Sequence, residues 1–179
     1  EIDGQAVDAN ETVTFKKINY TEADAGKTYT YTITEDGELK SGLSKSGDIT
    51  ATVKLTDDGK GNITAEVEYS NEDLITNTYK AKGQIVLEIE KELVGRDWQE
   101  GESYSFDLKD ENTTYDSQSI NKNGKVSFKA IEYTEIDAGK TYNYTITETG
   151  MMPSGITNSG DVSVKVMIAD NCDGTLKVE

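Results

Sequence analysis

The chain has 179 residues, with 34 acidic and 18 basic side chains and a formal net charge of −16. This charge would repel the phosphates of nucleic acids and of anionic membranes, so we expect neither as a partner. The sequence has no histidine and one cysteine, Cys172, which excludes an intrachain disulfide and argues against a zinc site. No apolar run is long enough to span a bilayer, and no phosphate-binding loop or nucleophile motif is present, so no cofactor is expected.

The most informative pattern is an internal repeat. Residues 1–66 and 114–179 align without a gap at an offset of 113 residues and are identical at 31 of 66 positions. A period of this length is typical of a separate sandwich domain of about 100 residues and is too long for a solenoid unit. Short Thr-, Tyr- and Val-rich segments separated by turn residues indicate strands. We therefore predict an all-β protein with two tandem β-sandwich domains, residues 1–80 and 81–179.

Each copy contains an alternating segment that ends in a glutamate. In residues 28–35 the large side chains and Glu35 share one face of the expected strand, while threonines occupy the other. Residues 141–148 repeat the pattern and place Glu148 at the same position. A carboxylate on the apolar face of a strand requires a specific partner.

Two more polar residues lie on apolar faces. Asn77 belongs to an expected strand over residues 73–79, and Lys91 belongs to one over residues 85–93. Because an isolated buried charge is costly, the lysine, the asparagine and the glutamates should contact one another.

This combination has two interpretations. In the structural one, a buried lysine and glutamate form an ion pair capped by the asparagine amide, or the side chains reach water from edge positions. In the chemical one, desolvation favours the neutral amine and the neutral acid, and the amine attacks the asparagine carboxamide. Ammonia would leave and an amide cross-link would remain, driven by an effective molarity of roughly 10⁵–10⁸ M for groups held in contact.

Residues 87–97 look like a lysine-bearing opening strand, residues 104–108 like the strand after it, and residues 123–128 like an asparagine-glycine turn. Residues 142–148 look like a glutamate strand and residues 75–79 like a closing asparagine strand. In this order they resemble the streptococcal-pilin type of isopeptide-linkage domain, a repeat of Gram-positive pilins and adhesins.

The resemblance implies immunoglobulin-like β-sandwich domains whose first and last strands are joined by a self-formed Lys–Asn bond, with a glutamate as assisting acid. By position, Lys91 and Glu148 belong to the second domain, and Glu35 and Asn77 to the first. At the offset of 113, the counterparts of Lys91 and Asn77 fall outside the sequence. The first repeat therefore lacks its opening strands and the second its closing strand, and we expect those strands to come from a partner chain or from a longer molecule.

Two other site types are compatible with parts of the sequence. The acidic turns at residues 57–62 and 170–174 offer oxygen ligands for calcium, but neither has the full twelve-residue loop pattern, and Asp-Gly is a common hairpin turn. Tyrosines could stack on sugars, although packing within the sheet is their usual role. The candidates are Tyr20, Tyr69, Tyr115 and Tyr133.

The sequence therefore predicts a structural stalk segment of a surface pilus or adhesin, located outside the cell and anchored to the wall of a Gram-positive bacterium. Its expected partners are neighbouring repeats or chains of the same protein. The alternative is an adhesin module that binds a host glycan or protein. We do not expect an enzyme, because the cross-linking chemistry would occur once per domain.

Overall fold

The computed structural model describes residues 1–8, 10–111 and 113–179 and divides into two compact units. Unit 1 comprises Glu1–Gly37 and Lys45–Thr76, and unit 2 comprises Glu38–Ser44 and Asn77–Glu179. Apart from two single-turn 3₁₀ helices, η1 (Glu22–Asp24) and η2 (Glu135–Asp137), the regular structure of the described residues is all strand. The predicted all-β class is confirmed.

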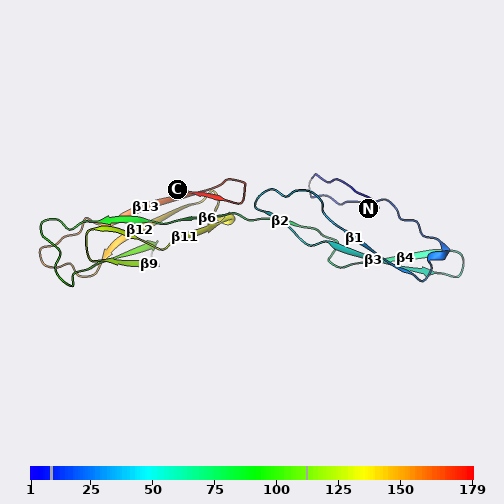
Figure 1. Cartoon of the computed structure of the whole chain (residues 1–179), viewed down its shortest axis with the longest axis horizontal. Helices are drawn as coiled ribbons and strands as arrows, with labels where there is room; N and C mark the ends of the chain where they lie inside the picture. The colour runs from blue at the N-terminus through cyan, green and yellow to red at the C-terminus, as the bar shows by residue number, and fades with distance from the viewer. Residues whose placement is uncertain (9, 112) are drawn as a thin grey trace. The chain divides into compact units, whose positions relative to one another are not determined.

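Unit 1 contains a three-stranded antiparallel sheet in the order β1-β3-β4 (Figure 1). Its strands are β1 (Thr28–Ile33), β3 (Ile49–Asp57) and β4 (Ile63–Tyr69). Alternate residues of β1 and β3 face inward, as the period-two pattern predicts. Two further short strands, β2 (Leu43–Lys45) and β5 (Asn77–Tyr79), pair with each other, and β5 and residues 43–44 of β2 belong to unit 2.

Unit 2 has a five-stranded antiparallel sheet in the order β14-β13-β12-β8-β9 and two two-stranded ladders, β7 with β10 and β6 with β11. The sheet strands are β8 (Tyr104–Asp110), β9 (Thr113–Ile120), β12 (Thr141–Thr149), β13 (Val162–Asp170) and β14 (Leu176–Val178). The ladder strands are β6 (Lys82–Ile85), β7 (Glu88–Lys91), β10 (Gly124–Ser127) and β11 (Ile131–Thr134).

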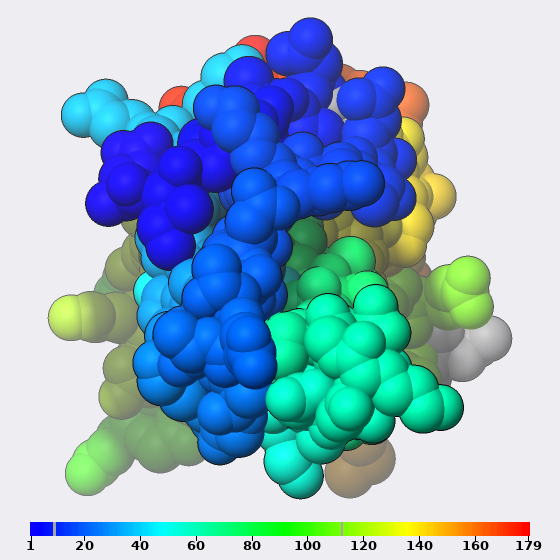
Figure 2. Space-filling view, turned by 90° about the vertical axis from the view of Figure 1, so that its right-hand side faces the viewer, coloured from blue at the N-terminus to red at the C-terminus, as the bar shows by residue number. Residues whose placement is uncertain are grey.

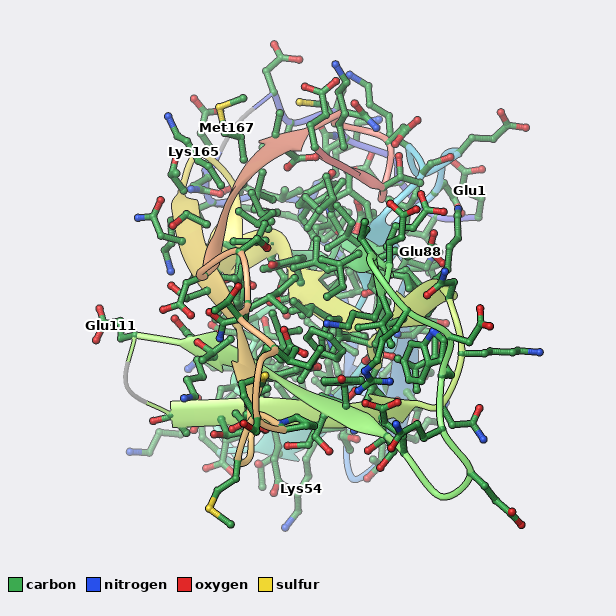
Figure 3. The ribbon with its side chains drawn as sticks, turned by 90° about the vertical axis from the view of Figure 1, so that its left-hand side faces the viewer. Glu1, Lys54, Glu88, Glu111, Lys165 and Met167 are labelled. Atoms are coloured by element: carbon green, nitrogen blue, oxygen red, sulfur yellow. The ribbon has the colours of Figure 1, made fainter. Side chains whose placement is uncertain are left out.

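One hydrophobic core joins the sheet and the ladders of unit 2. It includes Leu87 and Val126 from the β7/β10 ladder and Leu108, Ile146 and Val166 from the sheet, all of them buried. Intervening residues of the same strands point to solvent, as Lys165 and Met167 of β13 do in Figure 3. This two-layer arrangement around one core is that of a β-sandwich.

The internal repeat is visible in the hydrogen bonding of both units. The β1/β3 and β12/β13 pairs have the same register, because Thr28 lies opposite Lys54 and Thr141 lies opposite Met167. Each pair follows a 3₁₀ turn closed by a capping box. Each also carries a tyrosine hydroxyl pair at 2.8 Å, formed by Tyr20 with Tyr31 and by Tyr133 with Tyr144.

Two expected strands are shorter or divided in the structure. Of residues 73–79, only Asn77–Tyr79 forms a strand. Residues 85–93 are split because the chain changes partner: Ile85 ends the pairing with β11, and Glu88 begins the pairing with β10. The hydrogen bond from the Phe128 N–H to the Leu87 carbonyl bridges the change. The alternation predicted from the sequence nevertheless holds: the odd-numbered residues from Ile85 to Leu93 face inward and the even-numbered ones face solvent.

Candidate functional site

The structure brings Lys91 and Glu148 together inside unit 2. The Lys91 Nζ atom lies 2.8 Å from Glu148 Oε1, and the two side chains are only 11% and 8% exposed. Lys91 is the last residue of β7, and Glu148 lies near the end of β12. Alternation along both strands points these side chains into the core, so a shielded ion pair forms where two apolar faces meet.

Two aromatic rings also lie close to the lysine amine. Lys91 Nζ lies 4.2 Å from the ring centre of Tyr104 and 5.9 Å from that of Phe106. Phe106 is directly opposite Glu148 in the β8/β12 pair, which explains why the amine and the carboxylate share this environment. Cation–π attraction and the ion pair together fix the amine in a site with little access to water.

A polar network holds Tyr104 in place. Its hydroxyl donates a 2.7 Å hydrogen bond to Glu102 Oε1, and Arg96 binds the same carboxylate with both guanidinium nitrogens at 2.7 and 2.9 Å. The Gln99 N–H adds a further bond to Glu102. Trp98 packs edge-on against Tyr104, with ring centres 5.1 Å apart. The loop of residues 96–102 therefore positions the Tyr104 ring beside Lys91, a role that the sequence analysis did not predict.

The asparagine-glycine turn has a packing role here. The Asn123 side-chain oxygen accepts hydrogen bonds from the Leu93 N–H at 2.8 Å and from Trp98 Nε1 at 2.7 Å. These bonds tie the segment after β7 to the turn before β10. They fix the end of the strand that carries Lys91.

The Arg96–Glu102 pair gives unit 2 an acid-sensitive element. Hydrogen bonding from Arg96, then from Tyr104 and the Gln99 N–H, lowers the pKa of Glu102 from 4.5 to about 2. A carboxyl with a lowered folded-state pKa contributes stability above its unfolded pKa, and that contribution is lost as the pH falls towards the folded value. We expect unit 2 of the native chain to lose more thermal stability between pH 4.5 and pH 2 than the Glu102→Gln variant does. Thermal unfolding followed by Trp98 fluorescence measures the melting temperature of each chain as a function of pH. An equal fall in melting temperature for the two chains would contradict the prediction.

The two first-repeat residues are placed differently from the second-repeat pair. Glu35 follows β1 at the position aligned with Glu148, and one of its carboxylate oxygens is buried. Asn77 begins β5 and is exposed, so its expected position on a buried apolar face is not seen. Asn77 is also grouped with unit 2, whereas Glu35 lies in unit 1.

A comparison with protein-family models gives one match over both repeats. The FctA family, described as the Spy0128-like isopeptide-containing domain, matches residues 1–80 and 87–179. The chain belongs to this family. The resemblance to the streptococcal-pilin isopeptide-linkage domain is thereby confirmed, and two matched segments agree with a tandem repeat. No curated protein and no solved structure matches the chain.

The family places the chain among structural pilin domains. Within the described ranges, we find no group of three or more His, Cys, Asp or Glu side chains that could hold a metal ion. The turn at residues 57–62 is closed by Asp58, whose carboxylate accepts bonds from the N–H groups of Lys60 and Asn62. Among the residues that the structure describes, no helix is long and apolar enough to cross a membrane.

The four tyrosines that could stack on sugars divide into two groups. Tyr133 is 4% exposed and Tyr20 stacks on Tyr29, so both serve packing. Tyr69 and Tyr115 are 44% and 39% exposed.

Proposed function

We propose that the chain is a stalk segment of a Gram-positive surface pilus or wall-anchored adhesin whose repeats are strengthened by Lys–Asn isopeptide bonds. In the second repeat Lys91 supplies the amine and Glu148 the assisting acid. In the first repeat Glu35 is the assisting acid and Asn77 supplies the carboxamide. The observation that carries the proposal is the 2.8 Å contact between Lys91 Nζ and Glu148 Oε1 in a site lined by Tyr104 and Phe106.

The chemistry needs no cofactor. Lys91 passes a proton to Glu148, and the free amine attacks the carboxamide carbon of an asparagine, forming a new C–N bond. Glu148 then transfers protons from the attacking nitrogen to the leaving nitrogen, and the old C–N bond breaks. The leaving nitrogen departs as ammonium, and Glu148 is again a carboxylate.

The contacts around Lys91 support each of these steps. The Lys91 and Glu148 side chains are only 11% and 8% exposed, so little water competes for the contact between the reacting groups. The Tyr104 ring and the Glu148 carboxylate restrict where the amine can lie, which lowers the entropic cost of reaching the carboxamide. Glu148 is close enough to exchange protons with the amine directly.

The function of the bond is mechanical. A covalent link between the first and last strands carries tension around the folded core, and it keeps a protease from trapping an opened strand. Such a segment acts on the outer surface of the cell, and its partners are neighbouring repeats or chains of the same protein. Since each bond forms once, the reaction is maturation and gives no turnover.

The repeat supplies the strand needed to test this proposal. Glu179 aligns with Glu66 at the offset of 113, so residues 67–80 can be appended directly after Glu179 as a closing strand for the second repeat. We expect the appended chain to have an intact mass about 17 Da below its calculated value, because one ammonia is lost per bond. Lys91→Ala and Glu148→Ala in the same chain should each restore the calculated mass. An unreacted mass for the appended chain without substitutions would contradict the proposal.

A further inference from the structure

Two segments that belong to the first repeat by sequence are packed as part of unit 2. They are Glu38–Ser44 and the residues from Asn77 to the end of the repeat near residue 80. They meet as β2 and β5, which are each only three residues long. Because a two-stranded ribbon is at best marginally stable in water, β5 needs further contacts to stay in place.

The main anchor of β5 is Tyr79, which contacts the turn between β13 and β14. The Tyr79 hydroxyl donates a 2.7 Å hydrogen bond to Asp170 Oδ1 and accepts one from the Gly174 N–H at 3.2 Å. Asp170 Oδ1 also accepts a bond from the Cys172 N–H at 2.8 Å, which fixes the carboxylate within the turn. Both partners of the phenol therefore belong to the second repeat.

Two glycines allow the backbones to meet beside the Tyr79 ring. Gly42 and Gly174 both have a φ of +85°, a conformation that favours glycine. A Cβ atom on Gly42 would lie 2.6 Å from Tyr79 Cε2 and 2.7 Å from Gly174 Cα. The Lys80 N–H also donates to the Gly42 carbonyl at 2.8 Å. Any larger residue at position 42 would push the turn and β5 apart.

The chain that follows β5 is held by the second repeat as well. Ala81 is fully buried, and its N–H donates to Glu135 Oε2 at 3.2 Å. The Lys82 N–H donates to the Gly174 carbonyl at 3.2 Å. These anchors exist only in the folded second repeat, so the order of β5 depends on that repeat.

We propose that the turn at residues 170–174 of the second repeat anchors the closing strand of the first repeat, with Tyr79 as the residue that positions Asn77. Asn77 lies two residues before Tyr79, so both side chains project from the same side of β5. The cross-link of the first repeat would then form only after the second repeat has folded. The positioning role rests on the proposed function, and the anchoring does not.

Tyr79→Phe in the full chain tests the anchor, because it removes the hydroxyl and keeps the ring. We expect the amides of residues 77–80 to exchange about tenfold faster, since a hydrogen bond to a charged group is lost. The amides of β12 and β13 should not change. Tyr69→Phe is the matched control and should leave residues 77–80 unaffected. Tyr69 is 44% exposed and belongs to β4, which lies at the surface of unit 1 and is blue-green in Figure 2.

A pair of aligned glycines separates the contact from backbone strain. Gly155 aligns with Gly42 and has a φ of +80°, but no described atom lies within 4 Å of a Cβ atom built on it. Gly42→Ala should speed exchange of residues 77–80, and Gly155→Ala should not. The anchor is overturned if Tyr79→Phe leaves this exchange unchanged, or if the two glycine variants affect it equally.

The positioning role is tested in a chain with residues 82–113 placed directly before Glu1. Residue 114 aligns with Glu1, so the addition continues the repeat and supplies a lysine at the position of Lys91. We expect this chain to lose about 17 Da, one ammonia. Tyr79→Phe should slow the loss about tenfold, because misplacing a reacting group by about 1 Å can cost up to roughly a hundredfold in rate. The exchange of β12 and β13 should stay the same, which a general loss of structure would not allow.

The outcomes separate the two proposals. Faster exchange together with slower loss of ammonia supports both the anchor and the positioning role. Faster exchange with an unchanged rate of loss overturns the positioning role. If the extended chain without the Tyr79 substitution keeps its calculated mass, the isopeptide chemistry fails at this repeat, and the exchange result alone decides on the anchor.

Discussion

Replacing Glu148 with alanine should lower the free energy of unfolding of unit 2 by about 3–5 kcal/mol, the usual effect of removing one partner from a buried ion pair. The Lys91 ammonium would remain in a site where its side chain is 11% exposed, beside the Tyr104 and Phe106 rings but without the carboxylate. Urea unfolding of the full chain measures this effect. Its single tryptophan, Trp98, packs against Tyr104 and therefore reports on unit 2.

The matched control is Glu88, a carboxylate on the outward face of β7, the strand that carries Lys91. Glu88 contacts Lys125 at 3.1 Å, but the two side chains are 42% and 71% exposed. Glu88→Ala should change stability by less than about 1 kcal/mol. Replacing both charges, with Lys91→Met and Glu148→Leu together, should recover most of the loss, because no unpaired charge is left. A Glu148→Ala chain as stable as the Glu88→Ala chain would show that the pair is solvated and not a buried site.

A second large effect distinguishes the two repeats. Phe128→Ala should destabilise unit 2 by about 3–5 kcal/mol, because it leaves a cavity in a packed core. The aligned Phe15→Ala should cost unit 1 only about 1 kcal/mol, since the ring is already 39% exposed and loses less buried area.

Native-state hydrogen exchange of β12/β13 amides and of β1/β3 amides follows the two units separately in each variant. Equal losses from the two substitutions would mean that Phe15 is as well packed as Phe128.

The sequence predicts which side chains of a strand point inward better than it predicts which strands pair with each other. Alternation places Lys91 and Glu148 on apolar faces, and the cost of burying a lone charge predicts that they meet. The structure shows this contact. Both inferences depend only on local periodicity and on a general energetic rule, so they need no knowledge of the topology.

Features that depend on pairing between distant strands were not predictable in this way. Alternation puts Tyr104 and Phe106 on one face, but only the pairing of β8 with β12 sets Phe106 opposite Glu148. The division of the lysine strand arises because β10 and β11 are separate partners for its two halves. The exposure of Asn77 has a similar origin, since a strand's apolar face is buried only where another layer covers it.

The domain boundary remains a prediction. Residues 1–80 and 81–179 follow from the alignment of the two copies, whereas contacts group Glu38–Ser44 and Asn77 onward with unit 2. Residues 77–79 lie near the end of the first repeat in sequence but pair, as β5, with β2.

The central claim is that Lys91 is the amine of an isopeptide bond assisted by Glu148. Its most direct test is peptide mapping of the chain with residues 67–80 appended after Glu179. After proteolysis, tandem mass spectrometry should find one branched peptide in which the side chain of Lys91 is joined to the asparagine of the appended segment that corresponds to Asn77, and that peptide should be absent from the Glu148→Ala chain. Recovery of the two peptides unlinked, or a branch at another lysine such as Lys125, would contradict the account.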